Sequence, residues 1–259
     1  DRYGEVFNRR NQNFRLQKLK PALILAKKHE GFVLPVPSGF GIGGTNNFYF
    51  SHMYNCMYDC RYCFLQGMYS SANYVLFVNY EDFDKEIETT IKRYKGDAIT
   101  FFSGYDCDSL ALESLTGFVA HMLPLFSKYP NTLFELRTKS VQSVPLNSVK
   151  ALDNCVVAYS LMPEEISTQI DTKAPSIRRR LDNMKTLADL GWKIGLRFDP
   201  MIHGKNWQTL YKGLFKQVFS RISPKCVHSV SFGALRFPKP MFKKIHNLYP
   251  DEKLFSGPL

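Results

Sequence analysis

The sequence has no apolar run that could span a membrane, because about 18 consecutive apolar residues occur nowhere in its 259 positions. It also has no internal repeat, no low-complexity tract, and no basic start followed by an apolar segment of the kind found in secretory leaders. The first absence argues against a membrane protein and the second against a repeat protein. Acidic residues are few, 23 against 34 Lys and Arg, and the net charge of +11 favours a polyanionic partner such as nucleic acid.

Cysteine is scarce and unevenly placed. Three of the six cysteines fall within residues 56–63, and the others, Cys107, Cys155 and Cys226, are isolated. No second C-x2-C pair and no neighbouring fourth cysteine is present, which argues against a four-ligand structural zinc site and against a cluster used only for electron transfer. The pattern is also unlike a disulfide framework, so it predicts a reduced, cytoplasmic protein.

The three clustered cysteines, Cys56, Cys60 and Cys63, have C-x3-C-x2-C spacing, and the aromatic Tyr62 precedes the last of them. Three thiolates this close on a loop can bind three corners of one cubane cluster, which leaves the fourth iron without a protein ligand. A substrate or cofactor can coordinate such an open iron. The alternative is three cysteines that are merely buried or that bind zinc.

Apolar runs alternate with amphipathic segments over most of the chain. Strands are predicted at 47–51, 75–78, 98–102, 133–139, 156–160, 193–200 and 230–235, and helices at 81–94, 112–126, 176–190 and 207–222. About six strand–helix units after the cysteines predict an α/β fold with a parallel sheet, in the form of a partial, open (β/α)6 barrel of the TIM type. In such barrels the site lies at the carboxyl ends of the strands.

Two parts of the chain are predicted from this pattern. Residues 45–259 are expected to form the barrel, and residues 1–44 a basic N-terminal extension and entry loop. Within the extension, residues 21–29 are expected to form a helix with Pro21 in its first turn. The extension is interpreted as a solvated segment, with an arm that lies on phosphates as the alternative.

The cysteine loop resembles the signature of the radical S-adenosylmethionine (SAM) superfamily, and Tyr62 fits its aromatic position. Further motifs are similar to the spore photoproduct lyase family in consistent order over about residues 45–250. They are Asn55–Gln66, Thr138–Lys139, Tyr159–Ser160, Gly195–Trp207 and Leu235–Pro240.

The resemblance implies an enzyme, of lyase type, with two cofactors: a 4Fe–4S cluster on Cys56, Cys60 and Cys63, and SAM, which is cleaved to a 5′-deoxyadenosyl radical. Family members reverse a methylene-bridged thymine dimer in DNA, so DNA repair or a related base modification is expected, with DNA favoured over RNA. An electron donor such as flavodoxin or ferredoxin is also implied. The alternatives are a radical SAM enzyme that acts on a peptide or small molecule, and a non-catalytic, metal-stabilised nucleic-acid-binding protein.

Five SAM contacts are implied by the resemblance at strand ends and in the cysteine loop. Tyr62 would lie against the adenine, Ser103 and Gly104 would meet the methionyl amine, and Lys139 and Ser160 would contact the carboxylate and ribose. Glycine allows such a close backbone approach. The ordinary alternatives are a packing aromatic residue, a simple turn and a solvated lysine.

Arg197 is a further candidate for SAM binding because it lies within an otherwise apolar strand. A buried guanidinium is costly unless it is paired. It is therefore expected to meet a carboxylate, either that of SAM or that of Asp199, which shares its strand face.

The sequence departs from the family at the predicted catalytic position. Where the lyases carry a cysteine that returns a hydrogen atom to the product radical, the matching residue is Tyr105, and Cys107 lies two positions on. Both are therefore candidate hydrogen-atom donors. The residue after the third cysteine is Phe64, where the lyases have a tyrosine that helps relay the radical.

Overall fold

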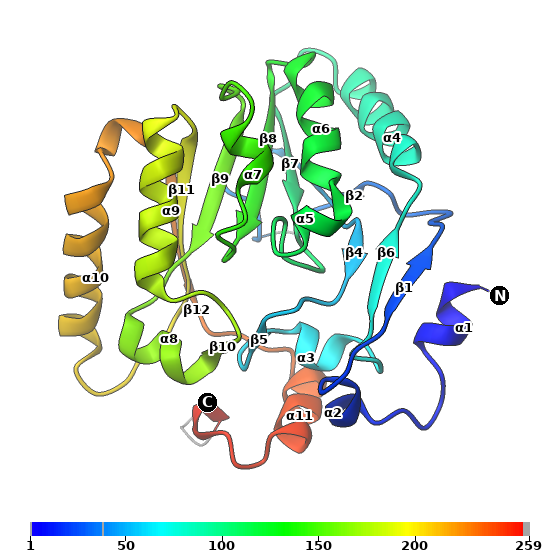
Figure 1. Cartoon of the computed structure of the whole chain (residues 1–259), viewed down its shortest axis with the longest axis vertical. Helices are drawn as coiled ribbons and strands as arrows, with labels where there is room; N and C mark the ends of the chain where they lie inside the picture. The colour runs from blue at the N-terminus through cyan, green and yellow to red at the C-terminus, as the bar shows by residue number, and fades with distance from the viewer. Residues whose placement is uncertain (1, 38, 256–259) are drawn as a thin grey trace.

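The computed structural model describes residues 2–37 and 39–255 of the chain, and its centre is a seven-stranded sheet (Figure 1). The strand order is β12-β11-β9-β8-β7-β3-β2. In chain order the strands are β2 (Leu34–Pro35), β3 (Asn46–Phe50), β7 (Ile99–Ser103), β8 (Thr132–Thr138), β9 (Cys155–Ser160), β11 (Lys193–Met201) and β12 (Val227–Ala234). Six of them are parallel and β2 is antiparallel to β3, so the predicted parallel sheet is present. Strands β2 and β3 precede the cysteines and five strands of the sheet follow them, whereas about six strand–helix units were expected after them.

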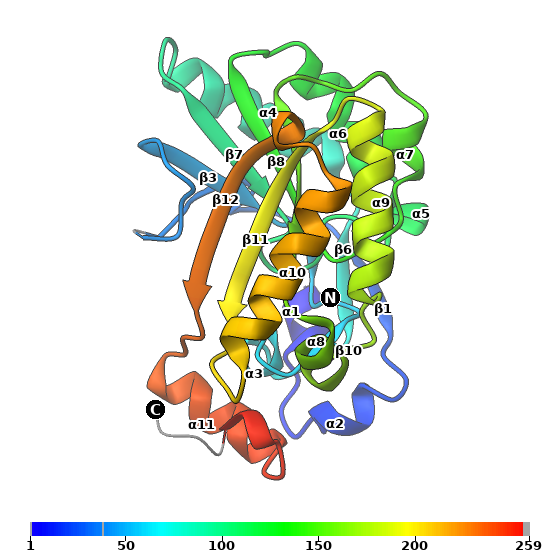
Figure 2. The same ribbon diagram turned by 90° about the vertical axis from the view of Figure 1, so that its left-hand side faces the viewer.

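The helices that precede and connect these strands lie along the outer face of the sheet, except for the short α8, which lies beyond the strand ends (Figures 1 and 2). They are α4 (Tyr80–Arg93), α5 (Glu113–Thr116), α6 (Phe118–Ser127), α7 (Val144–Asn147), α8 (Glu164–Ile170), α9 (Ile177–Asp189) and α10 (Trp207–Arg221). Ser176 begins α9 by accepting a hydrogen bond from the Arg179 amide, and Gly191 follows its end with φ +93, as the sequence predicts. The predicted helix at 112–126 is divided into α5 and α6 by Gly117, which has φ +59.

Side chains alternate along the strands between an apolar outer face and a polar inner face. On β8, the Phe134 ring stacks on Phe126 of α6 at a centroid distance of 4.1 Å, whereas the neighbouring Glu135 pairs with Arg197 of β11. The core therefore lies between the sheet and its helices, and the inner face carries charge. Strands β11 and β12 run toward the region that holds α3 and α11 (Figure 2).

A smaller sheet holds the N-terminal segment in place. Strand β1 (Leu23–Ala26) pairs in parallel with β6 (Tyr74–Phe77), which pairs with β4 (Met53–Tyr54). The helix predicted at 21–29 is therefore wrong: the apolar run Leu23–Ala26 is a strand because β6 supplies its hydrogen-bond partners. Helix α1 (Tyr3–Phe7) also packs on the body, with Phe7 buried and the Tyr3 ring 5.2 Å from Phe77. The division of the chain near residue 44 stays a prediction.

Short elements gather around the cysteines, near the carboxyl ends of the parallel strands (Figure 1). They are β5 (Asp59–Cys60), its antiparallel partner β10 (Asp171–Thr172), α2 (Phe14–Gln17), α3 (Leu65–Met68) and α11 (Lys239–Leu248). Two 3-10 helices, Pro224–Cys226 and Lys253–Phe255, complete the described elements.

No helix in the described part of the chain is both long enough and apolar enough to cross a membrane.

Candidate active site

The three clustered cysteines lie on one loop between β4 and α3. Burial raises the pKa of each thiol, and the thiols of Cys60 and Cys63 raise that of Cys56 further because they are close to it. The Tyr58 amide donates to Cys56 Sγ at 3.4 Å, a type of contact that tunes iron–sulfur clusters.

These thiols fit a cubane cluster better than a single ion. In the described ranges, no group of three His, Cys, Asp or Glu side chains is placed to hold one metal ion. A cubane needs a different arrangement, because each thiolate binds its own iron. Three thiols on one loop can each bind one iron of a 4Fe–4S cluster and leave its fourth iron open.

Asp171 anchors the cysteine loop and was missed by the sequence analysis. It accepts hydrogen bonds from the Tyr62 hydroxyl at 2.5 Å and from Arg180 Nη2 at 2.8 Å, and its backbone pairs with that of Cys60. The side chains of Asp171 and Arg180 are both 0% exposed. Burial opposes the charge of Asp171, but Lys139 and Arg180 more than offset it and hold the pKa of this carboxyl below its usual range.

Three predicted SAM-binding residues meet around this anchor. Lys139 Nζ lies 5.4 Å from the Tyr62 ring centroid, and the Ser160 carbonyl accepts from Arg180 Nη1 at 3.0 Å. Burial acts to lower the pKa of Lys139, but the neighbouring Cys60 and Asp171 more than offset it, so the pKa is raised. The structure thus brings Tyr62, Lys139 and Ser160 together beside Cys60, and their contacts with SAM stay predictions.

The turn after β7 forms a tight polar cradle. Gly104 has φ +81, and a Cβ there would lie 2.5 Å from Ser109 Oγ and 3.0 Å from the Arg137 carbonyl oxygen. The hydroxyls of Ser103 and Ser109 are buried and have no hydrogen-bond partner among the described residues. Buried polar groups are normally satisfied. These two hydroxyls therefore fit the predicted role of the turn, which is to meet a polar group of SAM.

Asp108 fixes this turn to the neighbouring strand. Its Oδ1 accepts from Thr138 Oγ1 at 2.6 Å and from the amides of Leu110 and Ala111, and its Oδ2 accepts from the Lys139 amide at 2.6 Å. The carboxylate thus links the carboxyl ends of β7 and β8. Sequence reasoning did not single it out, because its partners lie up to 31 residues away.

Arg197 meets a carboxylate, as predicted, but the partner is Glu135 and not Asp199. Arg197 Nη2 lies 2.5 Å from Glu135 Oε2, and the two side chains are 2% and 1% exposed. The guanidinium has room to cross β9 because Gly195 and Ala158 are small: a Cβ on Gly195 would lie 2.8 Å from Arg197 Nη2. Asp199 instead lies against Gly233, where a Cβ would approach its carboxylate to 2.5 Å. The expected Arg197–Asp199 pair is therefore wrong, and Glu135 was missed.

The two candidate hydrogen-atom donors have different surroundings. The Tyr105 ring stacks on Tyr49 at 4.3 Å, and it is partly exposed. Tyr49 pairs with Phe102 in the ladder and so belongs to the polar inner face, opposite to Phe101, which packs on α6. The Cys107 thiol lies instead in an apolar group with Met53 and Leu76, 4.0 Å from His52 Nδ1.

An open parallel barrel with a three-cysteine loop near the carboxyl ends of its strands defines the radical SAM class of proteins. The family model for spore photoproduct lyase matches residues 47–256, so the chain belongs to that family. This confirms the resemblance seen in the sequence.

Two curated relatives are similar over the same region. Spore photoproduct lyase of Bacillus subtilis (strain 168) is 21% identical over 202 residues, which are 77% of this chain and 59% of that protein. The lyase of Geobacillus sp. (strain Y412MC61) is 22% identical over 202 residues, with the same coverage. The chain thus spans 59% of the length of these relatives.

Solved structures of spore photoproduct lyase share the fold. A mutant with bound AdoMet and dinucleoside spore photoproduct has a TM-score of 0.80 and 17% identity, over 89% of this chain and 67% of that one. The lyase complexed with dinucleoside spore photoproduct has a TM-score of 0.75 and 17% identity over the same shares. This likeness confirms the predicted partial barrel.

Proposed function

We propose that the chain is a radical SAM enzyme that reverses the methylene-bridged thymine dimer in DNA. The observation that carries this proposal is the family match over residues 47–256, which includes all three cysteines of the loop. The net charge of +11 supports a polyanionic substrate. The site would work in the cytoplasm, where thiols stay reduced.

Each group of site residues has a part in this proposal. Cys56, Cys60 and Cys63 would hold a 4Fe–4S cluster, which when bound would supply the electron for cleavage of SAM to a 5′-deoxyadenosyl radical. The unpaired hydroxyls beside Gly104 receive the methionyl amine.

Lys139 would meet the SAM carboxylate, because its ammonium lies beside Tyr62 and Cys60. Arg197 is already paired with Glu135, so we assign it the role of holding the inner face in place. The bond from the Tyr62 hydroxyl to Asp171 fixes the ring that would face the adenine.

Tyr105 is the proposed hydrogen-atom donor. Its O–H bond breaks as a C–H bond forms on the product radical, and the phenol becomes a tyrosyl radical. Burial raises the pKa of Tyr105, which keeps its hydroxyl protonated at neutral pH. Cys107 is less suited because Met53 and Leu76 enclose its thiol.

The test is anaerobic reconstitution followed by reaction with dithionite, SAM and an oligonucleotide that carries the spore-type dimer. Repair to thymine with little net 5′-deoxyadenosine supports the proposal, and Cys60→Ala should abolish it. Formation of 5′-deoxyadenosine without repair would exclude the photoproduct as substrate. An intact cluster that yields no 5′-deoxyadenosine would contradict radical SAM chemistry altogether.

A pair of variants tests the donor. Tyr105→Phe should strongly reduce repair while SAM cleavage persists, and Cys107→Ala should leave repair close to that of the parent. The reverse result would assign the hydrogen atom to Cys107.

A further inference from the structure

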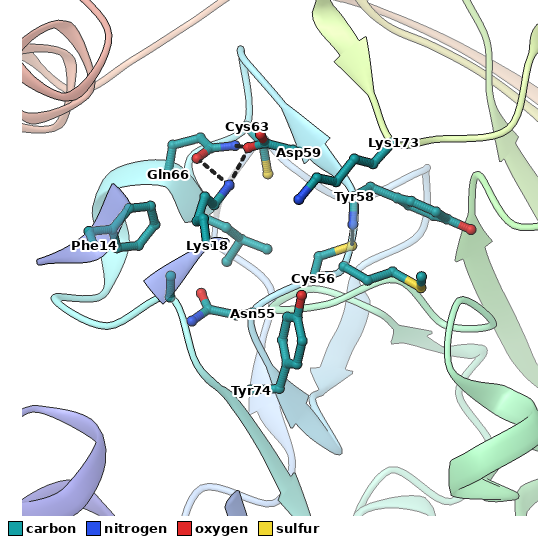
Figure 3. A pocket seen from close by; sticks show the side chains of 13 residues that line it. Phe14, Lys18, Asn55, Cys56, Tyr58, Asp59, Cys63, Gln66, Tyr74 and Lys173 are labelled. Atoms are coloured by element: carbon teal, nitrogen blue, oxygen red, sulfur yellow. Dashed lines mark hydrogen bonds and ion pairs between the residues drawn. The ribbon is translucent and has the colours of Figure 1, made fainter. Parts of the chain in front are cut away.

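A pocket borders the cysteine loop and is lined by side chains of that loop and of the segments around it (Figure 3). Its lining includes Phe14, Lys18, Cys56, Cys63, Tyr74 and Lys173. None of the described residues of the seven-stranded sheet lines it. Cys60, the remaining cysteine, is not in this lining and faces Lys139 and Asp171 instead. The pocket thus borders Cys56 and Cys63, whereas Cys60 lies closest to the predicted SAM-binding residues.

The rim of the pocket is basic. Lys173, on the turn after β10, points its amino group toward the cysteines, and Lys18 donates to Asp59 and Gln66 (Figure 3). Arg15 and Lys173 are exposed, and within the described ranges neither forms an ion pair with a carboxylate. Their charges are therefore available to a partner.

Exposed apolar side chains lie beside these charges. Leu16 is 63% exposed on α2, and Leu19 just beyond it is 81% exposed. An apolar centre within a charged rim is the usual composition of a protein–protein contact. Complementary charge mainly sets how fast two partners meet.

We propose that this pocket and the surface of α2 around it form the docking site for a small acidic electron carrier of the flavodoxin or ferredoxin type. This inference rests on the proposed function, because the cysteines must hold a redox cluster. One electron leaves the reduced carrier and enters the cluster on the side of Cys56 and Cys63, so the carrier is oxidised and the cluster reduced, with no proton or group transferred. The substrate side of the barrel stays free for SAM and DNA.

Charge reversal tests the site in the reconstituted holoenzyme. Reduction of the cluster by reduced flavodoxin is followed by rapid-mixing absorbance for Arg15→Glu/Lys173→Glu. A matched control, Lys95→Glu/Lys150→Glu, changes the net charge equally at exposed positions before β7 and β9, at the opposite end of the sheet. At low salt we expect the first variant to slow reduction about tenfold and the control by less than about twofold, with the difference shrinking as salt is added.

Binding gives a second readout that does not need a working cluster. Titration with oxidised flavodoxin should show affinity lost in Arg15→Glu/Lys173→Glu and retained in the control. Equal behaviour of the two variants in both measurements would overturn the proposal. Loss of DNA affinity with an unchanged reduction rate would also overturn it, and would assign the surface to nucleic acid.

The proposed function is tested separately by SAM cleavage with dithionite. If dithionite supports repair while flavodoxin reduces both variants equally, the docking site is wrong and the enzyme assignment stands. If the parent binds no cluster, the enzyme assignment itself fails.

Discussion

Replacing Asp171 with alanine should destabilise the protein and release the cysteine loop. The change removes a carboxylate whose partner, Arg180, is 0% exposed and lies 2.8 Å away. Breaking a buried ion pair from one side costs about 3–5 kcal/mol, because the remaining charge is left without compensation. The Tyr62 hydroxyl also loses its acceptor. At about 2 °C per kcal/mol for a chain of this size, the melting temperature should fall by roughly 6–10 °C.

The assay is thermal unfolding of the apoprotein, followed by the iron content after reconstitution. Iron should fall together with stability, because Tyr62, which directly precedes Cys63, loses the side chain that holds it. Asp189→Ala is the matched control: it removes an exposed carboxylate paired with Lys185 at side-chain exposures of 64% and 53%, and should cost less than about 1 kcal/mol. Equal melting temperatures for the two variants would refute the anchoring role of Asp171.

Three further predictions concern the inner face, the α3–α11 contact and the turn after β7. Burial acts to raise the pKa of Glu135, but Arg137 and Arg197 more than offset it and hold the pKa below its usual value. The ionised Glu135 side chain therefore stabilises the fold above about pH 4, and this contribution is lost as the pH falls below that. The difference in the free energy of unfolding between the parent and Glu135→Gln should shrink when unfolding is measured at lower pH. Gly67→Val should cost about 1–3 kcal/mol and expose α11 to limited proteolysis, because a Cβ there already lies 3.2 Å from Ile245 Cγ1. Gly104→Ala should weaken SAM binding by equilibrium dialysis, because the new methyl group meets Ser109 Oγ at 2.5 Å.

Each of these has a result that would contradict it. A pH-independent difference for Glu135→Gln would mean that this carboxyl is not held ionised by its arginines. Unchanged proteolysis of Gly67→Val would show that α11 can shift without loss. Normal SAM affinity in Gly104→Ala would place the methionyl amine elsewhere.

The regular part of the fold could be predicted from the sequence because local patterns determine it. Strand β7 is a short apolar run and α9 has a capping serine and a terminal glycine, so both were identified close to their observed bounds. Strand β1 was taken for a helix because its partner, β6, lies about 50 residues away and leaves no trace in the local pattern. The cysteine ligands were found for the same local reason, since their spacing is contained in eight residues.

The supporting residues of the site could not be found in this way. The partner of Arg197 was sought on its own strand, but Glu135 lies 62 residues earlier and faces it across β9. Asp171 lies in no recognisable motif. It holds the cysteine loop through a hydrogen bond from Tyr62, which is 109 residues away in the sequence. Such long-range pairs are set by how distant segments fold onto one another, which the local pattern of a single sequence does not display. A buried arginine such as Arg180 is the one usable signal, because it requires an acid somewhere in the fold.

The hydrogen bond between Gln66 and Tyr249 joins the cysteine loop to a part of the chain that comes much later in the sequence. Gln66, three residues after Cys63, donates to Asp59 and to the Cys60 carbonyl, and it accepts from Lys18 and from the Tyr249 hydroxyl. The last of these bonds closes across 183 residues. The support of the cysteine loop is therefore completed by a residue that directly follows α11, although the three thiols themselves lie within eight residues. A chain cut before α11 would keep all three cysteines and lose this bond, so α11 acts as the closing element of the loop.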